Sequence, residues 1–144
     1  MRTELFVELV VPDTEAITTL KTLQQMGFGV KKVLRRTYYR VEADEYIYDK
    51  LAGNDLLVNV NKHKSAPRHV LPDDGFIYFT ALVLDPKNHL GEVLSKECGV
   101  PVEDFSKGTI WILGFTSQEE ADLHGREIVN KLLYNKHFQE VELW

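Results

Sequence analysis

Cysteine is nearly absent from this sequence, which contains one, Cys98, among 144 residues. A disulfide within the chain is therefore excluded, and the protein needs no oxidising compartment to fold. Residues 1–13 have only short apolar stretches interrupted by acids, unlike a secretory signal. No stretch approaches the ~20 apolar residues that span a bilayer. We therefore expect a cytoplasmic protein with no membrane partner.

Sequence patterns for catalysis and cofactor binding are also missing. The five histidines lack both the i, i+4 pairing and the Cys-x-x-Cys companions that are typical of zinc sites. There is no Gly-x-Gly-x-x-Gly and no Walker-type Gly-Lys-Ser/Thr. Nothing in the sequence around Cys98 would lower the pKa of its thiol, which favours a buried structural cysteine over a nucleophile. We expect no catalytic residue, no cofactor and no metal.

The charge balance disfavours nucleic acid as a partner. The chain has 17 Lys and Arg against 22 Asp and Glu, for a net charge of −5 and a pI of about 5.5. An acidic chain gains little from releasing the counterions of a phosphate backbone. Two local basic clusters remain, and each is most simply a solvated face: Lys31, Lys32, Arg35 and Arg36 form one, and Lys62, Lys64 and Arg68 form the other.

Hydrophobic periodicity divides the first half into alternating strands and helices. Asp13 or Thr14 is suited to cap a helix that Gly27 ends. The pattern predicts a strand at 3–11, a helix at 14–26, a strand at 30–42, a short helix at 44–52 and a strand at 56–60.

The same order begins again after a Pro- and Asp-rich connector. Ser117 with Glu120 three residues later is the capping-box pattern. The second half predicts a strand at 76–84, a helix at 86–98, a turn at Lys107-Gly108 followed by a strand, a helix at 118–133 and a strand at 138–143. The resulting organisation is a first unit at 1–61, a connector at 62–75 and a second unit at 76–144.

Short phrases also repeat between the halves. FVELVVPD (6–13) corresponds to FTALVLDP (79–86), 73 positions later, and KLAGN (50–54) corresponds to KLLYN (131–135), 81 positions later. The second unit thus gains eight residues, most simply as a longer second helix. We predict an α+β fold in which two tandem β-α-β-α-β units form a pseudo-dimer, with mainly antiparallel sheets and helices packed on one face. A unit of three strands is marginal alone, and pairing two units removes that difficulty.

Several of these segments together resemble the PurS subunit of phosphoribosylformylglycinamidine synthase. In the second half the resemblance lies in VLDPKNHLGEVLSKECGV (83–100), VEDFSKGTIWIL (102–113) and EIVNKLLYNKHFQEVEL (127–143). In the first half it lies in VVPDTEAITTLKTLQQMGF (10–28), VKKVLRRTYYRVE (30–42) and DKLAGNDLLVNV (49–60). The chain departs from the family where Val11, Pro12 and Asp13 replace Leu-Asp-Pro, and where Thr37 and Tyr38 replace Gly-Lys.

The resemblance implies a non-catalytic assembly subunit in purine biosynthesis. PurS-like subunits join a synthetase subunit to a glutaminase subunit, so the chain would be an accessory part of an ATP-dependent amidotransferase-type ligase. The alternative is a small-molecule-sensing regulatory or protein-interaction module that has drifted from purine synthesis, with its ligand in a groove between helices where the units meet. A homo-oligomer is compatible with both hypotheses.

Interface residues follow from charge and from the repeated phrases. Three arginines stand on one predicted strand of an acidic chain, which suits an external partner. Asn54 and Asn135 end the second helices; they either adopt a left-handed terminal conformation or bond across the two units. Trp144 is expected to dock in a core or an interface. The candidate interface is Arg35, Arg36, Arg40, Lys50, Asn54, Asp85, Pro86, Lys131 and Asn135.

Overall fold

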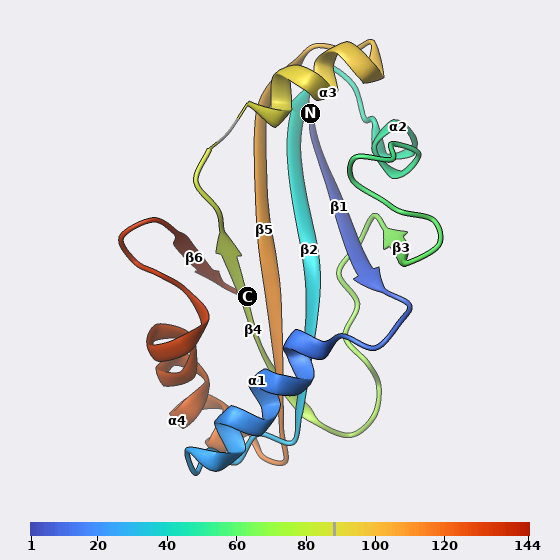
Figure 1. Ribbon diagram of the computed structural model, residues 1–144. Coiled ribbons are helices and arrows are strands. Elements are labelled where there is room, and N and C mark those ends of the chain that lie inside the picture. The colour runs from blue at the N-terminus through green and yellow to red at the C-terminus, as the bar shows by residue number, and fades with distance from the viewer. Residues whose placement is uncertain (88) are drawn as a thin grey trace.

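The computed structural model describes residues 1–87 and 89–144, and it is an α+β fold (Figure 1). In the described residues the first half contains β1 (Arg2–Leu9), α1 (Thr14–Gln25), β2 (Lys32–Ala43), α2 (Tyr48–Ala52) and β3 (His63–Ala66). The second half contains β4 (Ile77–Leu84), α3 (Leu90–Cys98), β5 (Val102–Phe115), α4 (Gln118–Ile128), a π-helical continuation η1 (Val129–Leu133) and β6 (Glu140–Leu143).

The strands of the described chain form one six-stranded sheet in the order β3-β1-β2-β5-β4-β6. Every neighbouring pair is antiparallel. The longest ladder joins β2 to β5, from the pair Lys32 and Gly114 to the pair Ala43 and Val102, with Thr37 opposite Thr109 near its middle. The two halves of the chain therefore meet at the centre of the sheet.

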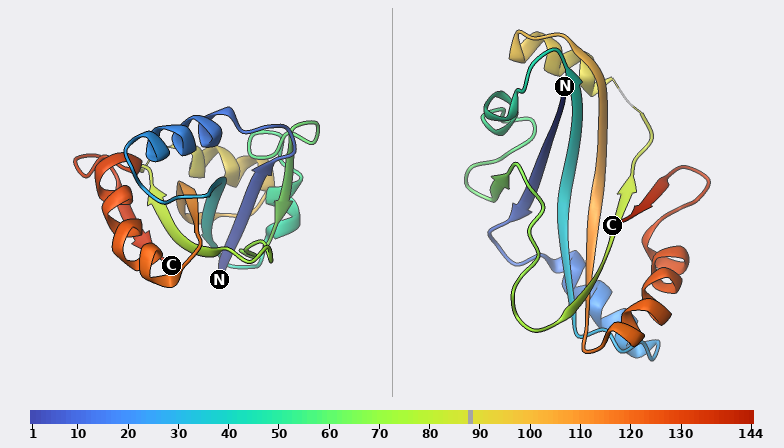
Figure 2. Two further views of the ribbon diagram at one scale, coloured as in Figure 1. Left: turned by 90° about the horizontal axis from the view of Figure 1, so that it is seen from below. Right: turned by 180° about the vertical axis from the view of Figure 1, so that it is seen from behind.

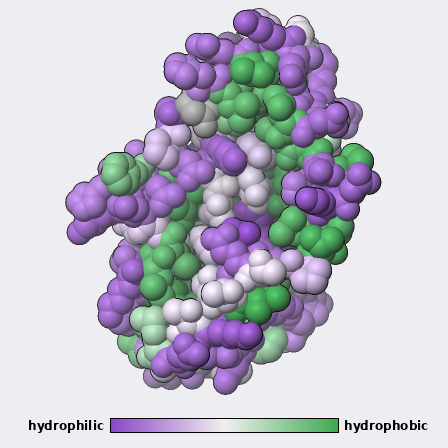
Figure 3. Space-filling model, viewed as in Figure 1, coloured by the Kyte–Doolittle hydropathy of each residue, from purple (hydrophilic) through white to green (hydrophobic). Residues whose placement is uncertain are grey.

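The four α-helices of the described residues all pack on one face of the sheet. Side chains alternate along a strand, so odd-numbered positions point to one side here. Two buried clusters contain these positions: α1 and α4 cover the first, and α2 and α3 cover the second. Figure 3, which views the helical side, shows mainly hydrophilic residues, with separate hydrophobic patches near α3 at the top and beside α4. The expectation of helices on one face is confirmed.

The connector and the C-terminus cover the opposite face. Its buried residues are Phe6, Tyr38, Leu82, Ile110 and Ile112. The connector between β3 and β4 runs behind the sheet in Figure 1 and in front of it in the rear view of Figure 2. His69 of the connector and Trp144 pack their rings against Phe6, at centroid distances of 5.7 and 6.1 Å. Trp144 therefore packs against this face as expected, but it is not buried in a core, since 44% of it remains exposed.

The contact between Phe6 and Trp144 requires a curled sheet. Phe6 lies on β1, whereas the backbone N–H of Trp144 extends the line of β6 by donating to the carbonyl of Thr80. In a flat sheet these lines would be four strand spacings apart, about 19 Å. Two aromatic side chains do not bridge that distance, so the sheet bends toward the face opposite the helices.

The predicted helix signals are mostly confirmed. Asp13 caps α1 by accepting a hydrogen bond from the N–H of Ala16, and Ser117 caps α4 by accepting one from the N–H of Glu120. Gly27 and Gly99 follow α1 and α3 with positive φ angles of 89° and 68°, which glycine adopts without strain. Helix α2 begins only at Tyr48 and α3 at Leu90. The part of the predicted 86–98 helix that falls on residue 88 lies outside the described residues.

One strand prediction and one turn prediction are wrong. Residues 56–60 form no strand, because Leu57 and Val58 are buried in a turn closed on the carbonyl of Asn54. The third strand is β3, inside the predicted connector. The turn expected at Lys107-Gly108 is also wrong, since β5 runs through it with β2 and β4 hydrogen-bonded on either side. A turn there would leave both ladders unpaired.

No helix of residues 1–87 and 89–144 is long and apolar enough to cross a membrane.

Gly125 tests the close packing of α4 on the sheet. A Cβ at this position would lie 2.4 Å from Cγ of Phe79, at the base of its ring. Alanine normally stabilises a helix relative to glycine by about 1 kcal/mol. Because of the overlap we expect Gly125→Ala to lower the free energy of unfolding by about 1–3 kcal/mol in urea titrations. Leu123→Ala, at an exposed position of the same helix, should change it by less than about 0.5 kcal/mol. An unchanged or raised value for Gly125→Ala would contradict the packing described.

Candidate functional site

Arg35 lies on the helical face of β2 and is fully engaged within the protein. Its Nε and Nη2 donate to the carboxylate of Asp13 at 3.1 and 3.0 Å, and its Nη1 donates to Glu15. The guanidinium also lies over the ring of Trp111, 5.8 Å from the ring centroid. Asp13 is the residue that caps α1, so Arg35 fixes the start of that helix to the sheet.

Arg36 points to the opposite face, and 13% of its side chain is exposed. Its Nε donates to Glu8 at 3.3 Å, and its Nη1 lies 3.2 Å from Nδ1 of His69. A guanidinium only donates, so Nδ1 must accept, and Nε2 of His69 carries the proton. Burial and the charge of Arg36 both lower the pKa of His69. The imidazole is therefore held neutral between Arg36 and the rings of Phe6 and Trp144.

Arg40 closes a hydrogen-bonded chain across the curled sheet. Its Nη1 and Nη2 donate to the two carboxylate oxygens of Glu142 on β6, at 3.2 and 3.0 Å. Its Nε donates to the hydroxyl of Tyr38 at 2.9 Å, and that hydroxyl donates to Glu4. Burial and the hydrogen bond to Glu4 raise the pKa of Tyr38. Tyr38 is thus a fixed neutral phenol at the centre of this chain.

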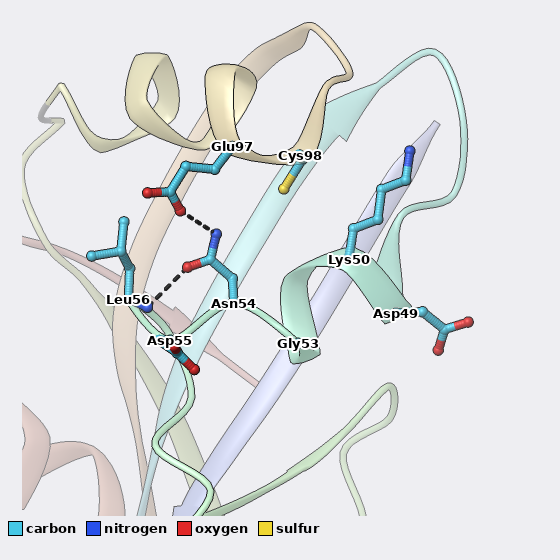
Figure 4. Close-up of a pocket in the computed structure, with 8 residues that line it drawn as sticks. All are labelled: Asp49, Lys50, Gly53, Asn54, Asp55, Leu56, Glu97 and Cys98. Atoms are coloured by element: carbon cyan, nitrogen blue, oxygen red, sulfur yellow. Dashed lines mark hydrogen bonds between the residues drawn. The ribbon is translucent and has the colours of Figure 1, made fainter.

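Lys50 and Asn54 line a groove between α2 and α3, which we call the α2–α3 groove. It is an open hollow of about 600 Å³ that Glu97 and Cys98 complete from the second half of the chain. Figure 4 shows Asn54 directed at Glu97, and its Nδ2 donates to that carboxylate at 2.7 Å. Lys50 points away from this pair and lies 3.3 Å from Glu45.

The two asparagines of the repeated phrase make the same turn. In each, the side-chain oxygen accepts the N–H two residues later: Leu56 for Asn54 and His137 for Asn135. Each backbone carbonyl accepts the N–H groups three and four residues later. Neither asparagine is left-handed, because the described residues with positive φ are all glycines. The left-handed interpretation of these asparagines is therefore wrong.

A third asparagine, Asn59, makes this turn and leads directly into β3, as Asn135 leads into β6. Asn59 donates its N–H to the His63 side chain, and Asn135 donates to the Gln139 side chain, four residues on in both cases. In its position before a strand, Asn59 is thus the counterpart of Asn135, five residues after the Asn54 that the repeated phrase indicates. Sequence comparison missed this because the flanking residues differ.

The second copy of the phrase borders a shallow hollow of about 620 Å³ that includes Asn130, Tyr134, Asn135, Lys136 and His137. Lys131 lies on η1 and pairs with Glu127 at 2.7 Å. The five residues that line this hollow each have a counterpart 81 positions earlier in the sequence. All five counterparts line the α2–α3 groove. The first hollow has Asp49 and Asp55 where the second has Asn130 and Lys136, so the two differ in charge.

Two further hollows lie on the face opposite the helices, the first within the first half and its connector, the second between residues of both halves. The first, which we call the basic hollow, measures about 270 Å³, and its charged residues are Glu8, Arg36, Lys64 and Arg68. The second, the acidic hollow, measures about 310 Å³ and includes Asp85 and Pro86. Its charged residues are Arg2, Arg40, Lys87, Glu42, Asp85, Asp104, Glu140 and Glu142.

The nine predicted interface residues therefore do not form one surface. Arg40, Asp85 and Pro86 meet in the acidic hollow, and Arg36 lies in the basic one. Lys50 and Asn54 share the α2–α3 groove, with Asn135 in the corresponding hollow of the second half. Sequence reasoning overlooked Glu8, His69 and Glu142, which hold the arginines; single acids and a histidine on strands and loops carry no distinctive pattern.

Among the described residues, no group of three His, Cys, Asp or Glu side chains is placed to hold a metal ion. Burial raises the pKa of the Cys98 thiol, which opposes formation of the nucleophilic thiolate.

Comparison of the sequence with protein-family models gives no match. Comparison with curated proteins gives no significant match.

His69 makes folding stability depend on pH. Its pKa in the folded protein lies below the ordinary value of 6.5, so the unfolded chain binds the proton more readily. The stabilisation is fully present above pH 6.5 and is lost as the pH falls through the lower folded value. We expect the free energy of unfolding to drop less between about pH 7.5 and about pH 5 in His69→Asn than in the wild type. His137→Asn, at an exposed site, should behave as wild type; identical pH profiles for all three proteins would contradict the assignment.

Proposed function

We propose that this chain is a fused pair of PurS-like units that acts as a non-catalytic assembly subunit. In this role it joins the synthetase and glutaminase subunits of phosphoribosylformylglycinamidine synthase. The observation that carries the proposal is the sheet order, in which each half contributes three strands and the halves meet at β2 and β5. The element order β-α-β-α-β also occurs once in each half.

The pairing between the halves supports a local two-fold relation. In the β2–β5 ladder Thr37 faces Thr109, 72 positions later (109 − 37), and Arg36 faces Ile110 as Tyr38 faces Gly108. The same separation relates Gly27 to Gly99, the two positive-φ residues after α1 and α3. An antiparallel pair of equivalent strands is how two identical subunits share a sheet about a two-fold axis. These features favour a duplicated unit whose copies replace the subunits of a dimer.

The two halves differ most in charge, which suits a role between two different partners. The two-fold relation that places Thr37 opposite Thr109 makes Arg36 equivalent to Gly108 and Arg40 equivalent to Ile112. Followed outward through the neighbouring strands, it makes Lys64 on β3 equivalent to Glu140 on β6. A homodimer presents two identical ends. A fused pair with a basic and an acidic hollow presents two distinct ends, so a synthetase and a glutaminase would each have its own.

The proposal predicts capture of both partners from the source cell. We expect the tagged chain to retain the synthetase and the glutaminase, and the double variant Lys50→Glu/Lys131→Glu to retain at least about tenfold less of either. Both lysines are exposed and belong to the repeated phrase. The matched control is Lys21→Glu on the outer side of α1, which should retain as much as the wild type. A folded wild-type chain that retains neither partner would overturn the proposal.

A second function, small-molecule sensing, is favoured by the position of the α2–α3 groove. This groove lies between helices from different halves, and Asn54 and Glu97 bond across it. A ligand bound there would stabilise the folded state by linkage. We expect at least one amino acid or nucleotide to raise the melting temperature of the wild type and not that of Asn54→Ala. Equal shifts in both proteins, or none in the wild type, would count against this function.

A further inference from the structure

The basic hollow unites the two cation clusters that stand apart in the sequence. Arg36 comes from β2, Lys64 from β3, and Arg68 from the connector that follows β3. Together with Glu8 they give the hollow an excess of two positive charges in a chain whose net charge is −5. A local excess of this sign inside an acidic protein raises the concentration of small anions at that place.

Arg36 is held in position before any ligand arrives. Glu8 binds its Nε, and His69 accepts from its Nη1, while His69 is itself packed between the rings of Phe6 and Trp144. Its Nη2 makes no hydrogen bond within the described part of the chain and remains a donor for a ligand. A donor fixed in this way loses little side-chain freedom when it binds.

Glu8 shows that the hollow accepts a carboxylate between its cations. Its carboxylate lies 2.7 Å from Nζ of Lys64 and 3.3 Å from Nε of Arg36. Burial alone would raise the pKa of Glu8, but these two cations outweigh burial and lower it. Glu8 is therefore an ionised internal competitor for any incoming anion. Arg68 has no ion pair among the described residues, so its charge is uncompensated.

The remaining wall of the basic hollow is apolar. Phe6, Ala66 and Val70 line it beside the cations. A simple inorganic anion would satisfy the charges and leave this wall in water. An organic anion with a small ring would cover it, at a gain of about 25 cal/mol per Å² of apolar surface removed from water. The volume of about 270 Å³ suits one ring and one head group.

We propose that the basic hollow binds a small organic anion that carries one doubly charged head group, a phosphate monoester or a dicarboxylate, on an apolar body. Arg36, Lys64 and Arg68 take the head group, and the wall of Phe6, Ala66 and Val70 takes the body. This hollow lies on the face opposite the α2–α3 groove, so the proposal does not rest on small-molecule sensing at that groove. The same hollow is one of the two ends considered above for a protein partner, but the anion site is defined by its lining residues alone.

Calorimetric titration of the full chain with phenyl phosphate and with phenylmalonate tests this site. We expect saturable binding of at least one, with about tenfold or more weaker binding of inorganic phosphate, which lacks the apolar body. Lys64→Ala and Arg68→Ala should each weaken binding about tenfold, since each removes a charge-assisted hydrogen bond. Glu8→Gln should strengthen it about tenfold, because the internal competitor is gone.

Lys64→Ala and Arg68→Ala are expected to weaken binding, whereas Glu8→Gln is expected to strengthen it. Damage to the fold would weaken binding in every variant, so this difference distinguishes loss of a ligand contact from misfolding. The matched control is Lys62→Ala, an exposed neighbour that does not line the hollow. It should bind as the wild type does, and thermal melts should confirm that all variants are folded. Failure of both organic anions to bind would overturn the proposal. So would inorganic phosphate binding as tightly as phenyl phosphate, or Glu8→Gln weakening the affinity.

Discussion

The β2–β5 ladder is the interaction on which the rest of the structure depends. It joins the two three-stranded halves of the sheet at its centre. Because β5 is hydrogen-bonded on both edges, it runs straight through Lys107-Gly108 where the local residues alone favour a turn. The two buried hydrophobic clusters beneath the helices also depend on the β2–β5 ladder, because both contain side chains from β2 and β5. Separating the two strands would expose both cores.

The curl of the sheet decides where the charge of Arg40 on β2 goes. Arg36 meets Glu8 directly across the neighbouring strand β1, as it would on a flat sheet. Arg40 meets Glu142 on β6, three strands away, only because the sheet is curled. The connector and Trp144 pack against the apolar residues of this face. Most of the cationic character of this strand is therefore used inside the protein. The other charged residues of this face line the basic and acidic hollows.

The two halves have the same order of elements, and the differences between them carry the candidate functions. Equivalent strand positions hold a lysine in one half and a glutamate in the other, so the two ends of one face have opposite charge. Likewise the repeated phrase forms two hollows with the same turn, and only the first is completed by residues from the opposite half. A symmetric pair of units would present the same charge at both ends, whereas this chain presents lysine at one strand position and glutamate at the equivalent one.

Local chemistry in the sequence determined much of this protein. The helix caps at Asp13 and Ser117, the stops at Gly27 and Gly99, and the alternation on β1, β2 and β4 follow from neighbouring residues, and all were predictable. The location of the third strand could not be predicted. Residues 56–60 are of the types that favour strands, yet Leu57 and Val58 fill a core that only the folded sheet creates. The partners of Arg36 and Arg40 were hidden for the same reason, since they lie 28 and 102 residues away along the chain. Periodicity reports what each segment prefers alone, whereas curl, register and the pairing of distant charges arise only when the segments pack together.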